Sequence, residues 1–365
     1  MEKRRSARTP WALVLLILAF SCMLSYGMAV LGTKVFDNET FGRYQIMNIS
    51  NIQDLQVTSS GFVYYDGSTV SSISSAGKVN WSYLVGQNAD FDASDYGVAA
   101  WSGKTLTLID ASSGTTTFNG AMDEDVMSAR VGDKYTAILM GDESNSTMVL
   151  MENGGRQINK ITLTSQTAVD YGFFSNGSLL WVMVCDTNGT VPVCNIQTYR
   201  PGKEIVGSIG DTQQLVYAVM FQSNQVCVAG DTYLKVYDYT GMEEEARRKL
   251  IYGWYLADSD EVSIDPLMAF VTDSQYSQSD IRDVRMIRSN LDKVVRLPFG
   301  CMDLECVGDT IYGFASDGHM MILKAGAQKA DAYRLNLAID KVYGVTRDGV
   351  AILGSGASTY LVTLV

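Results

Sequence analysis

Carboxylate side chains recur along the 365-residue chain, each time between two short apolar runs. The main positions are Asp90, Asp92, Asp123, Asp125, Asp170, Asp211, Asp258, Asp260, Asp303 and Asp340. If they gather on one face, they could hold Ca²⁺, which prefers oxygen ligands, or bind a basic segment of a partner. Aspartate also initiates turns by bonding its own backbone, which is the structural alternative. No D-x-D-x-D-G calcium loop is present, so we predict no metal or cofactor, with Ca²⁺ left open.

Some of these acids could form a catalytic pair. Glycosidases use two carboxyl groups about 5 to 9.5 Å apart, and Asp123, Asp125, Asp258 and Asp260 are conceivable members of such a pair. A Ser-His-Asp triad would require His319, the single histidine, which lies in the turn SDGHMM. We predict no catalytic residues, with an exported carbohydrate-active hydrolase or lyase as the alternative.

Two further groups of side chains could act in binding or in covalent linkage. Trp254 and Tyr255, in YGWYLADSD, precede acids and would suit a sugar or peptide ligand if exposed, or blade packing if buried. Cys185 and Cys194 flank DTNGTVPV, which reads as a hairpin that places them opposite one another, as a disulfide in an exported protein requires. None of the six cysteines forms a CxxC pair, which argues against a thiolate metal site.

The N-terminus predicts export. Residues 1–10 are basic, and residues 11–31 carry no charge, a length that can cross a membrane as a helix. We predict a cytoplasmic segment 1–10, a transmembrane signal anchor 11–31, a linker 32–42 and an extracytoplasmic domain from residue 43, since the basic flank stays inside. A lipoprotein signal ending before Cys22 and a cleaved secretory peptide are the alternatives.

The charge of the chain restricts its partners. The formal net charge is −12, and the N-terminal segment is basic, so the domain that follows is strongly acidic. Nucleic acids and anionic lipid surfaces attract positive charge, which makes both poor partners for this domain. We therefore predict a protein or cell-envelope partner, in addition to the membrane that holds the anchor.

The positions above must be held by a β structure. After Lys34, short runs rich in Val, Ile, Tyr, Thr and Leu alternate with Gly, Asn, Asp and Ser, which is typical of an all-β protein. Glycine-marked hairpins repeat with a period of about 40 residues, the mark of a four-stranded propeller blade. Seven blades are predicted at 55–84, 91–119, 126–163, 169–209, 215–252, 261–298 and 302–336. Residues 339–365 supply three more strands, and the segment 43–49 would close the ring as the fourth, giving eight blades, with seven as the alternative count.

The clearest repeat copies carry a family resemblance. In SSAGKVNWSY (74–83) and LTLIDASSGTTTF (106–118), an acidic or polar turn with glycine precedes the outer strand. The repeat residues are Gly77, Trp81, Asp110, Gly114, Asp238 and Gly241. The pattern resembles that of quinoprotein-like propellers with PQQ-type repeats, in which the tryptophan is a structural dock between blades. The layout is also similar to that of eight-bladed outer-membrane assembly lipoproteins, and to a group of clostridial single-pass proteins that carry a domain of unknown function.

The resemblance implies a fold and no reaction. No motif in the chain matches the calcium site or catalytic aspartate of quinone-dependent dehydrogenases. A rigid ring with variable loops predicts a membrane-tethered scaffold that binds a protein or an envelope ligand without catalysis. A sensor ectodomain is a further alternative to the hydrolase.

Overall fold

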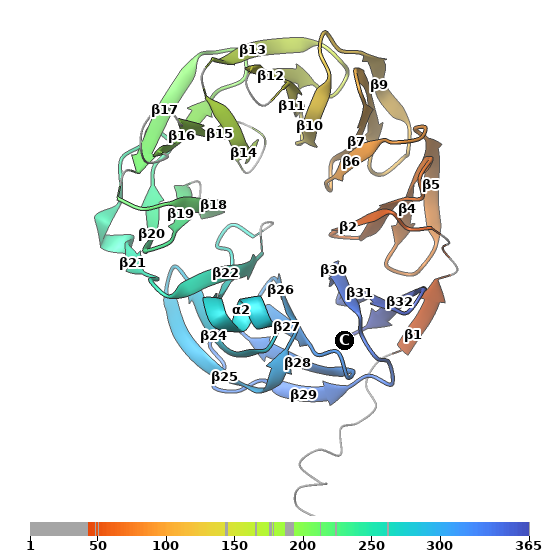
Figure 1. Ribbon diagram of the computed structural model, residues 1–365, viewed down its shortest axis with the longest axis vertical. Helices are drawn as coiled ribbons and strands as arrows, with labels where there is room; N and C mark the ends of the chain where they lie inside the picture. Colours follow the sequence, from red (N-terminus) through yellow and green to blue (C-terminus); the bar gives the residue numbers. More distant parts are fainter. Residues whose placement is uncertain are drawn as a thin grey trace, which may run out of the picture.

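The computed structural model describes residues 43–47, 49, 51–142, 145–164, 166–174, 177, 179–186, 193–211, 213–222, 225–260 and 263–364. These residues form a closed ring of eight antiparallel four-stranded sheets around a central channel (Figure 1). The eight-bladed all-β propeller is thereby confirmed, and the seven-blade alternative is wrong.

Seven of the sheets are consecutive in sequence, and their strands run in order from the channel to the rim. The first four blades are β2 (Asp54–Thr58), β3 (Gly61–Tyr65), β4 (Thr69–Ser74), β5 (Val79–Leu84); β6 (Asp90–Ala93), β7 (Gly97–Ser102), β8 (Thr105–Asp110), β9 (Thr116–Ala121); β10 (Val126–Val131), β11 (Tyr135–Gly141), β12 (Asn145–Glu152), β13 (Gln157–Thr164); and β14 (Thr167–Phe173), β15 (Leu180–Asp186), β16 (Val193–Tyr199), β17 (Ile205–Asp211).

The next three blades follow the same order. They are β18 (Val216–Gln222), β19 (Gln225–Gly230), β20 (Tyr233–Tyr237), β21 (Lys249–Leu250); β22 (Trp254–Ser259), β23 (Met268–Thr272), β24 (Ile281–Arg288), β25 (Leu291–Cys301); and β26 (Asp303–Val307), β27 (Thr310–Phe314), β28 (His319–Lys324), β29 (Asp331–Arg334). Two short helices interrupt them: the 3₁₀ helix η2 (Glu245–Arg247) in blade 5 and α2 (Asp273–Gln278) in blade 6.

The eighth blade joins the two ends of the described chain. β30 (Lys341–Val345), β31 (Val350–Ser355) and β32 (Ser358–Thr363) are completed at the rim by β1 (Arg43–Met47), which pairs antiparallel with β32. Met47 is 8% exposed and packs in the cluster between blade 8 and blade 1, whereas Tyr44 and Ile46 are about half exposed. The first strand of the domain therefore closes the ring through its hydrogen bonds and one anchoring side chain.

The core is divided among the gaps between blades. Eight clusters of buried apolar side chains occur, one between each pair of neighbouring sheets. The two middle strands of a blade are covered on both faces, which explains apolar runs such as Val98–Ala99–Ala100 in β7 and Ile138–Leu139–Met140 in β11. Outer strands such as β25 alternate between exposed and buried positions.

The predicted start of the sixth blade is wrong. We expected it at Glu261, but the innermost strand is β22, Trp254–Ser259. The register of β22 against β23 shifts between Leu256 and Asp258, so one residue is extra and the strict alternation of a strand is broken there. The bulge, together with Asp258 inside the strand and Asp260 directly after it, gives the strand the appearance of a loop in sequence.

The predicted cytoplasmic segment, anchor and linker, residues 1–42, lie outside the described residues. Within the part that is described, no helix has the length and apolar character needed to span a bilayer.

Candidate functional site

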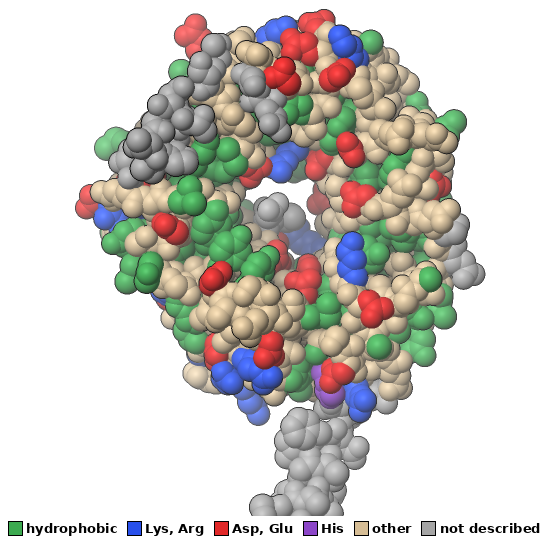
Figure 2. Space-filling model, viewed as in Figure 1, with side chains coloured by type: hydrophobic (Ala, Val, Ile, Leu, Met, Phe, Trp, Pro, Cys, Tyr) green, Lys and Arg blue, Asp and Glu red, His purple; other side chains and the backbone are tan. Residues whose placement is uncertain are grey.

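The eight innermost strands border the channel and are rich in carboxylates. They carry two cations, Arg130 and Lys341, against a larger acidic set: Asp54, Asp90, Asp92, Asp170, Asp258, Asp303 and Glu305. In the space-filling view an opening remains at the centre of the ring, with acidic side chains on its border (Figure 2). A channel whose border carries an excess of one sign of charge concentrates ligands of the opposite sign.

Backbone bulges set the direction of two of these acids. The pairing of innermost strands with their neighbours shifts by one residue between Ala168 and Asp170 in β14 and between Leu256 and Asp258 in β22. Asp170 and Asp258 therefore take equivalent positions in blades 4 and 6. Bulges change the direction of a side chain relative to the rest of its strand, and no residue pattern in the sequence predicts these two bulges.

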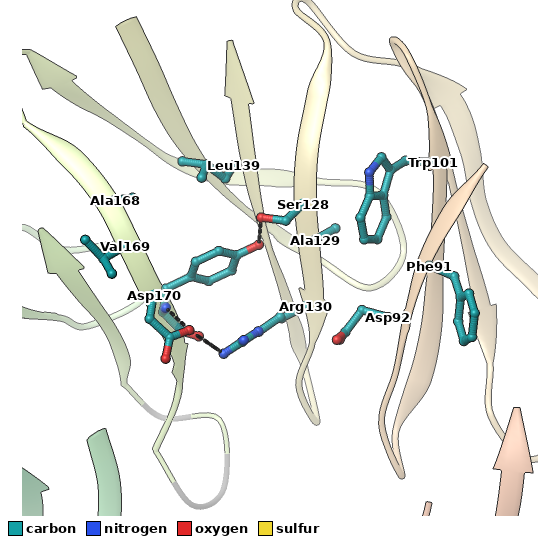
Figure 3. A pocket seen from close by; sticks show the side chains of 11 residues that line it. Phe91, Asp92, Trp101, Ser128, Ala129, Arg130, Leu139, Ala168, Val169 and Asp170 are labelled. Carbon is teal, nitrogen blue, oxygen red and sulfur yellow. Dashed lines mark hydrogen bonds and ion pairs between the residues drawn. The ribbon is translucent and has the colours of Figure 1, made fainter. Parts of the chain in front are cut away.

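A pocket of about 190 Å³ opens between blades 2, 3 and 4. Arg130 of β10 lies between Asp92 of β6 and Asp170 of β14, and its guanidinium points to Asp170 (Figure 3). The Arg130 Nη1 to Asp170 Oδ1 distance is 3.0 Å, and Arg130 also donates to the carbonyl oxygen of Tyr171. Both charged side chains remain partly exposed, at 44% and 34%, so this ion pair adds little to stability and both groups stay accessible to a ligand.

Aromatic rings form the wall behind Arg130. Its guanidinium carbon lies 5.3 Å from the ring centre of Tyr171, and the Tyr171 hydroxyl is 2.7 Å from the hydroxyl of Ser128. Burial raises the pKa of Tyr171 far above its usual range, so this phenol stays neutral. Trp101 lines the far side. The pocket thus offers carboxylates, one guanidinium fork and aromatic faces, a set suited to the polar side chains of a peptide.

A second acidic group forms where blade 6 meets blade 7. Asp258 of β22 accepts the backbone N–H of Cys306 in β26 at 2.5 Å, which brings it beside the two acids of β26, Asp303 and Glu305. Burial, and then the charges of Asp258 and Asp303, raise the pKa of Glu305 to about 9. Burial also raises the pKa of Asp303. At neutral pH Glu305 is therefore protonated in the folded protein.

Asp258 and Asp303 are among the acids predicted from the sequence, whereas Glu305 is not. Glu305 stands two residues after Asp303 on one strand, so both point to the same face of the sheet. The spacing of two residues between Asp303 and Glu305 was the feature of the sequence from which Glu305 could have been predicted as part of the site.

The Glu305→Gln variant is expected to be more stable than the wild type above neutral pH. The pKa of Glu305 is raised in the folded state from 4.5 to about 9, so the folded protein binds more protons than the unfolded chain in this range and wild-type stability falls as pH rises through it. Glutamine stays neutral. We expect a gain on the order of 2 kcal/mol at pH 8, reduced from the full linkage because water reaches this half-buried side chain.

The measurement is urea unfolding at pH 5, 7 and 8.5, with Glu204→Gln as the exposed control. The gain should shrink towards pH 5. A gain of equal size at all three pH values would show that Glu305 does not titrate as described.

The predicted aromatic residues lie at the start of β22. Tyr255 stacks on Tyr217 of β18 with ring centres 4.8 Å apart, and Tyr276 of α2 lies 5.0 Å from Tyr255. Tyr255 is 37% exposed and Tyr276 47%. Trp254 is half-buried below the guanidinium of Arg285. Tyr255 and Tyr276, rather than Trp254, therefore supply the accessible aromatic surface, in a strand and a helix rather than in the loop that we expected.

The other predicted acids do not converge on one point. Asp90 begins β6 and is exposed, Asp123 pairs with Lys160 at 3.5 Å, and Asp125 is exposed in the loop before β10. Asp340 accepts the N–H of Gly356 at 2.5 Å. Asp260 is 6% exposed and accepts the N–H of Gly308 in the next blade at 3.0 Å. Of the four acids considered for a glycosidase pair, Asp123 and Asp125 lie in the loop before β10, and Asp258 and Asp260 in or directly after β22. The prediction of no catalytic residues, with a hydrolase as the alternative, stays a prediction.

The glycines and aspartates of the repeat lie at the turns between the third and outer strands, and Trp81 lies in the outer strand β5. Gly77, Gly114 and Gly241 have φ values of +77°, +68° and +104°, which side chains with a Cβ rarely adopt. Asp110 and Asp238 accept hydrogen bonds from their own turns, and bonds from Ser112 and Ser113 lower the pKa of Asp110 to about 2. The indole of Trp81 packs on the turn of the following blade.

The two cysteines of blade 4 lie directly opposite one another. Cys185 of β15 is paired in register with Cys194 of β16, and their sulfur atoms are 2.8 Å apart. This is longer than a disulfide bond of about 2.05 Å, so both are free thiols here. Burial and the neighbouring thiol raise the pKa of Cys194 to about 12.

We expect Cys185 and Cys194 to be linked in protein recovered from an oxidising compartment. The loop that the bond would close is short, so the link should add about 3 kcal/mol or slightly less. Peptide mapping without reductant should find the crosslinked peptide, and reduction should lower the urea midpoint of the wild type but not that of Cys185→Ala. Alkylation of both thiols in the unreduced, denatured protein would contradict this prediction.

In the described part of the chain, no group of three or more His, Cys, Asp or Glu side chains is arranged to hold a metal ion. That the chain has no metal or cofactor, with Ca²⁺ left open, stays a prediction.

Comparison with known proteins shows the fold alone. No protein-family model and no curated protein matches the sequence. Similar solved structures include Sqt1 of Saccharomyces cerevisiae, with 9% identity, a TM-score of 0.60 and coverage of 90% of this chain and 99% of that one. The C-terminal WD40 domain of Sif2 has 10% identity, a TM-score of 0.59 and coverage of 90% and 99%.

BamB from Moraxella catarrhalis is similar to this chain at 12% identity, with a TM-score of 0.54 and coverage of 88% of this chain and 98% of that one. This likeness supports the eight-bladed layout that the sequence resemblance implied. The resemblance to the clostridial group stays a prediction.

Proposed function

We propose that this chain is a protein-binding propeller, held at the outer side of a cell membrane by its N-terminal apolar segment. A basic segment of its partner contacts the acidic border of the central channel. The observation that carries the proposal is the excess of carboxylates over cations on the innermost strands. Propellers among the similar structures, such as the WD40 domain of Sif2, are consistent with a scaffold role.

The distribution of charge and aromatic surface supports a peptide-like ligand. The Asp258–Asp303–Glu305 group lies in blades 6 and 7, and the exposed rings of Tyr255 and Tyr276 belong to blade 6. A lysine or arginine beside the carboxylates would favour the ionised form of Glu305. Binding should therefore release a proton and strengthen as pH rises from 6 to 9.

The test is capture of partners from solubilised membranes by the full-length chain. The channel variant combines Asp258→Asn, Asp303→Asn and Glu305→Gln. Its matched control has the same change in charge at exposed outer positions, Glu204→Gln, Glu245→Gln and Asp331→Asn. We expect one set of proteins to be recovered by the wild type and the control and lost by the channel variant. Equal recovery by all three would remove the channel from the proposal.

The raised pKa of Glu305 favours a second candidate, an exported hydrolase. A protonated carboxylic acid beside the carboxylate of Asp258 is the combination that a glycosidase uses as acid and base or nucleophile. Release of reducing sugars from envelope polysaccharide by the wild type, and its loss in Glu305→Gln, would support this function. Turnover that is unchanged in Glu305→Gln would exclude that residue as the acid.

A further inference from the structure

Blade 5 has an incomplete outer strand. β21 contains two residues, Lys249–Leu250, and lies at the rim of the ring (Figure 1). In place of a longer strand, the chain forms η2, and Tyr237 makes an isolated bridge with Glu243. The gap between blades 5 and 6 is therefore not covered by a regular outer strand, and a pocket of about 130 Å³ opens there.

The floor and the rim of this pocket differ in chemistry. The floor is apolar and consists of Leu234 and Val236 of blade 5 with Met268 and Ile287 of blade 6, each at most 2% exposed. The rim carries four cations and a hydroxyl: Arg247, Arg248, Lys249, Arg288 and Ser289. Among the described residues that line the pocket there is no carboxylate. Such a concentration of positive charge is unexpected in a chain with a net charge of −12.

The cations have acidic partners behind the rim. Arg248 is bound to both oxygens of Glu243 at 2.6 and 2.9 Å, Lys249 lies 3.6 Å from Asp292, and Arg288 lies 2.5 Å from Asp309. These pairs hold the cationic groups in place. Asp309 is 78% exposed, so its bond to Arg288 is readily exchanged for one to another anion.

Arg288 also has a donor without an acceptor. Its Nε is buried and makes no hydrogen bond to any described residue. Its Nη atoms bind Asp309 and the carbonyl oxygen of Gly308. A buried N–H without an acceptor is destabilising, and because this atom is closed to solvent, only a shift of the side chain that opens it to the pocket would let an anion accept from it. Arginine presents several N–H groups in one plane, a geometry that fits oxyanions.

We propose that the pocket between blades 5 and 6 binds a tetrahedral oxyanion of the phosphate type. The volume is well below the roughly 300 to 1,000 Å³ of pockets for drug-sized ligands, so the bound group is small. Arg247, Arg248 and Lys249 supply charge from one side, and Arg288 donates from the other. The phosphate is either free or the terminal group of a small ester. This site lies at the rim and is independent of the channel.

The test is titration of the full-length chain in detergent with two probes, followed by calorimetry at low ionic strength. Inorganic phosphate represents the free anion, and glycerol 3-phosphate represents the ester. Arg288→Gln removes the donors of blade 6, and Arg248→Gln removes an exposed cation whose loss is less able to affect folding. Arg296→Gln is the matched control, because it makes the same change in charge on β25, where Arg296 is 65% exposed and paired with Asp283.

We expect saturable binding of inorganic phosphate that is weakened about tenfold or more by Arg288→Gln, since each charge-assisted bond contributes that much, and less by Arg248→Gln. Arg296→Gln should bind as the wild type does. Binding of glycerol 3-phosphate but not of free phosphate would assign the site to esters. If Arg288→Gln unfolds, Arg248→Gln decides. Absence of binding of both probes, or equal weakening in Arg296→Gln, would overturn the proposal.

Discussion

Replacement of Lys235 with methionine is expected to lower the free energy of unfolding by about 3 to 5 kcal/mol. The Lys235 Nζ lies 2.8 Å from Asp211 Oδ2, and the two side chains are 3% and 2% exposed. Methionine fills nearly the same space but has no charge. The carboxylate of Asp211 would then remain buried without its cation, and an unpaired buried charge strongly destabilises the folded protein.

Several hydrogen-bond donors stabilise the ionised form of Asp211. Burial acts to raise its pKa, but hydrogen bonds from Lys235, the backbone of Gln213 and the side chain of Gln214 outweigh burial and lower it. A lowered pKa in the folded state means that this stabilisation is present at neutral pH and is lost as pH falls below about 4. The bridge joins the last residue of β17 to β20, so it ties blade 4 to blade 5.

The free energy of unfolding lost in Lys235→Met should depend on the presence of Asp211 and on the burial of the ion pair. In the double variant Lys235→Met with Asp211→Asn no buried charge remains, so most of the lost stability should return and the double-mutant cycle should show strong coupling. Lys160→Met is the matched control, since Lys160 and Asp123 are 41% and 78% exposed and such pairs contribute at most about 1 kcal/mol. Urea unfolding at pH 7 of the wild type, Lys235→Met, Asp211→Asn, the double variant and Lys160→Met measures the effect. Equal losses for Lys235→Met and Lys160→Met would contradict the argument.

The eight-bladed fold could be predicted because its signals are local. Each middle strand is covered on both faces and is therefore an apolar run, as in Val226–Cys227–Val228, and turns such as those at Gly77 and Gly114 need a glycine. The start of blade 6 could not be predicted, because a bulge at Ala257 removes the alternation on which strand prediction depends.

Contacts between blades could not be predicted from the sequence. Glu305 lies near Asp258 only because β26 packs beside β22. The relative placement of two neighbouring blades is set by this packing and not by the sequence of either blade alone. Lys235 in YLKVY reads as a solvated side chain on an ordinary strand, although it is buried. Phe118 and Ile158 differ from Trp81 in residue type, but each of the three packs on the turn glycine of the following blade. Trp81 lies against Gly114, Phe118 against Gly155 and Ile158 against Gly202.

That shared position makes Trp81 the second residue with a large expected effect. Its side chain is 9% exposed and its Nε1 donates to the carbonyl oxygen of Ala111 in the next blade at 2.9 Å. Trp81→Ala removes the largest side chain between blades 1 and 2 and should lower the free energy of unfolding by about 3 to 5 kcal/mol. Trp81→Phe keeps the ring and should lose less. Unchanged stability of Trp81→Ala together with loss of a binding partner would show that the residue acts in recognition instead.

Substitution of Gly114 tests the contact between the Trp81 ring and the turn of blade 2 by changing the turn instead of the ring. A Cβ at Gly114 would lie 2.4 Å from Cγ of Trp81, and its φ is +68°. Gly114→Ala therefore combines a left-handed backbone, which costs about 1 to 2 kcal/mol, with a clash against a buried ring. Gly103 has a similar φ of +54°, but its nearest neighbour would be 3.9 Å away. Gly103→Ala thus measures the backbone cost alone.

The clash should disappear when its partner is removed. Alanine at position 81 would keep the Cβ, which lies 2.5 Å from the Cβ of an alanine at 114, so the background that removes the clash is Trp81→Gly. There Gly114→Ala is expected to cost only about as much as Gly103→Ala, that is about 1 to 2 kcal/mol, whereas in the wild type it should cost clearly more. The difference between the two backgrounds is the coupling energy of the tryptophan with the turn. If Gly114→Ala costs the same in both backgrounds, the ring does not press on the turn in solution. Phe118→Ala and Gly155→Ala should repeat the coupling between blades 2 and 3, because the Cβ of residue 155 would lie 2.4 Å from the Phe118 ring.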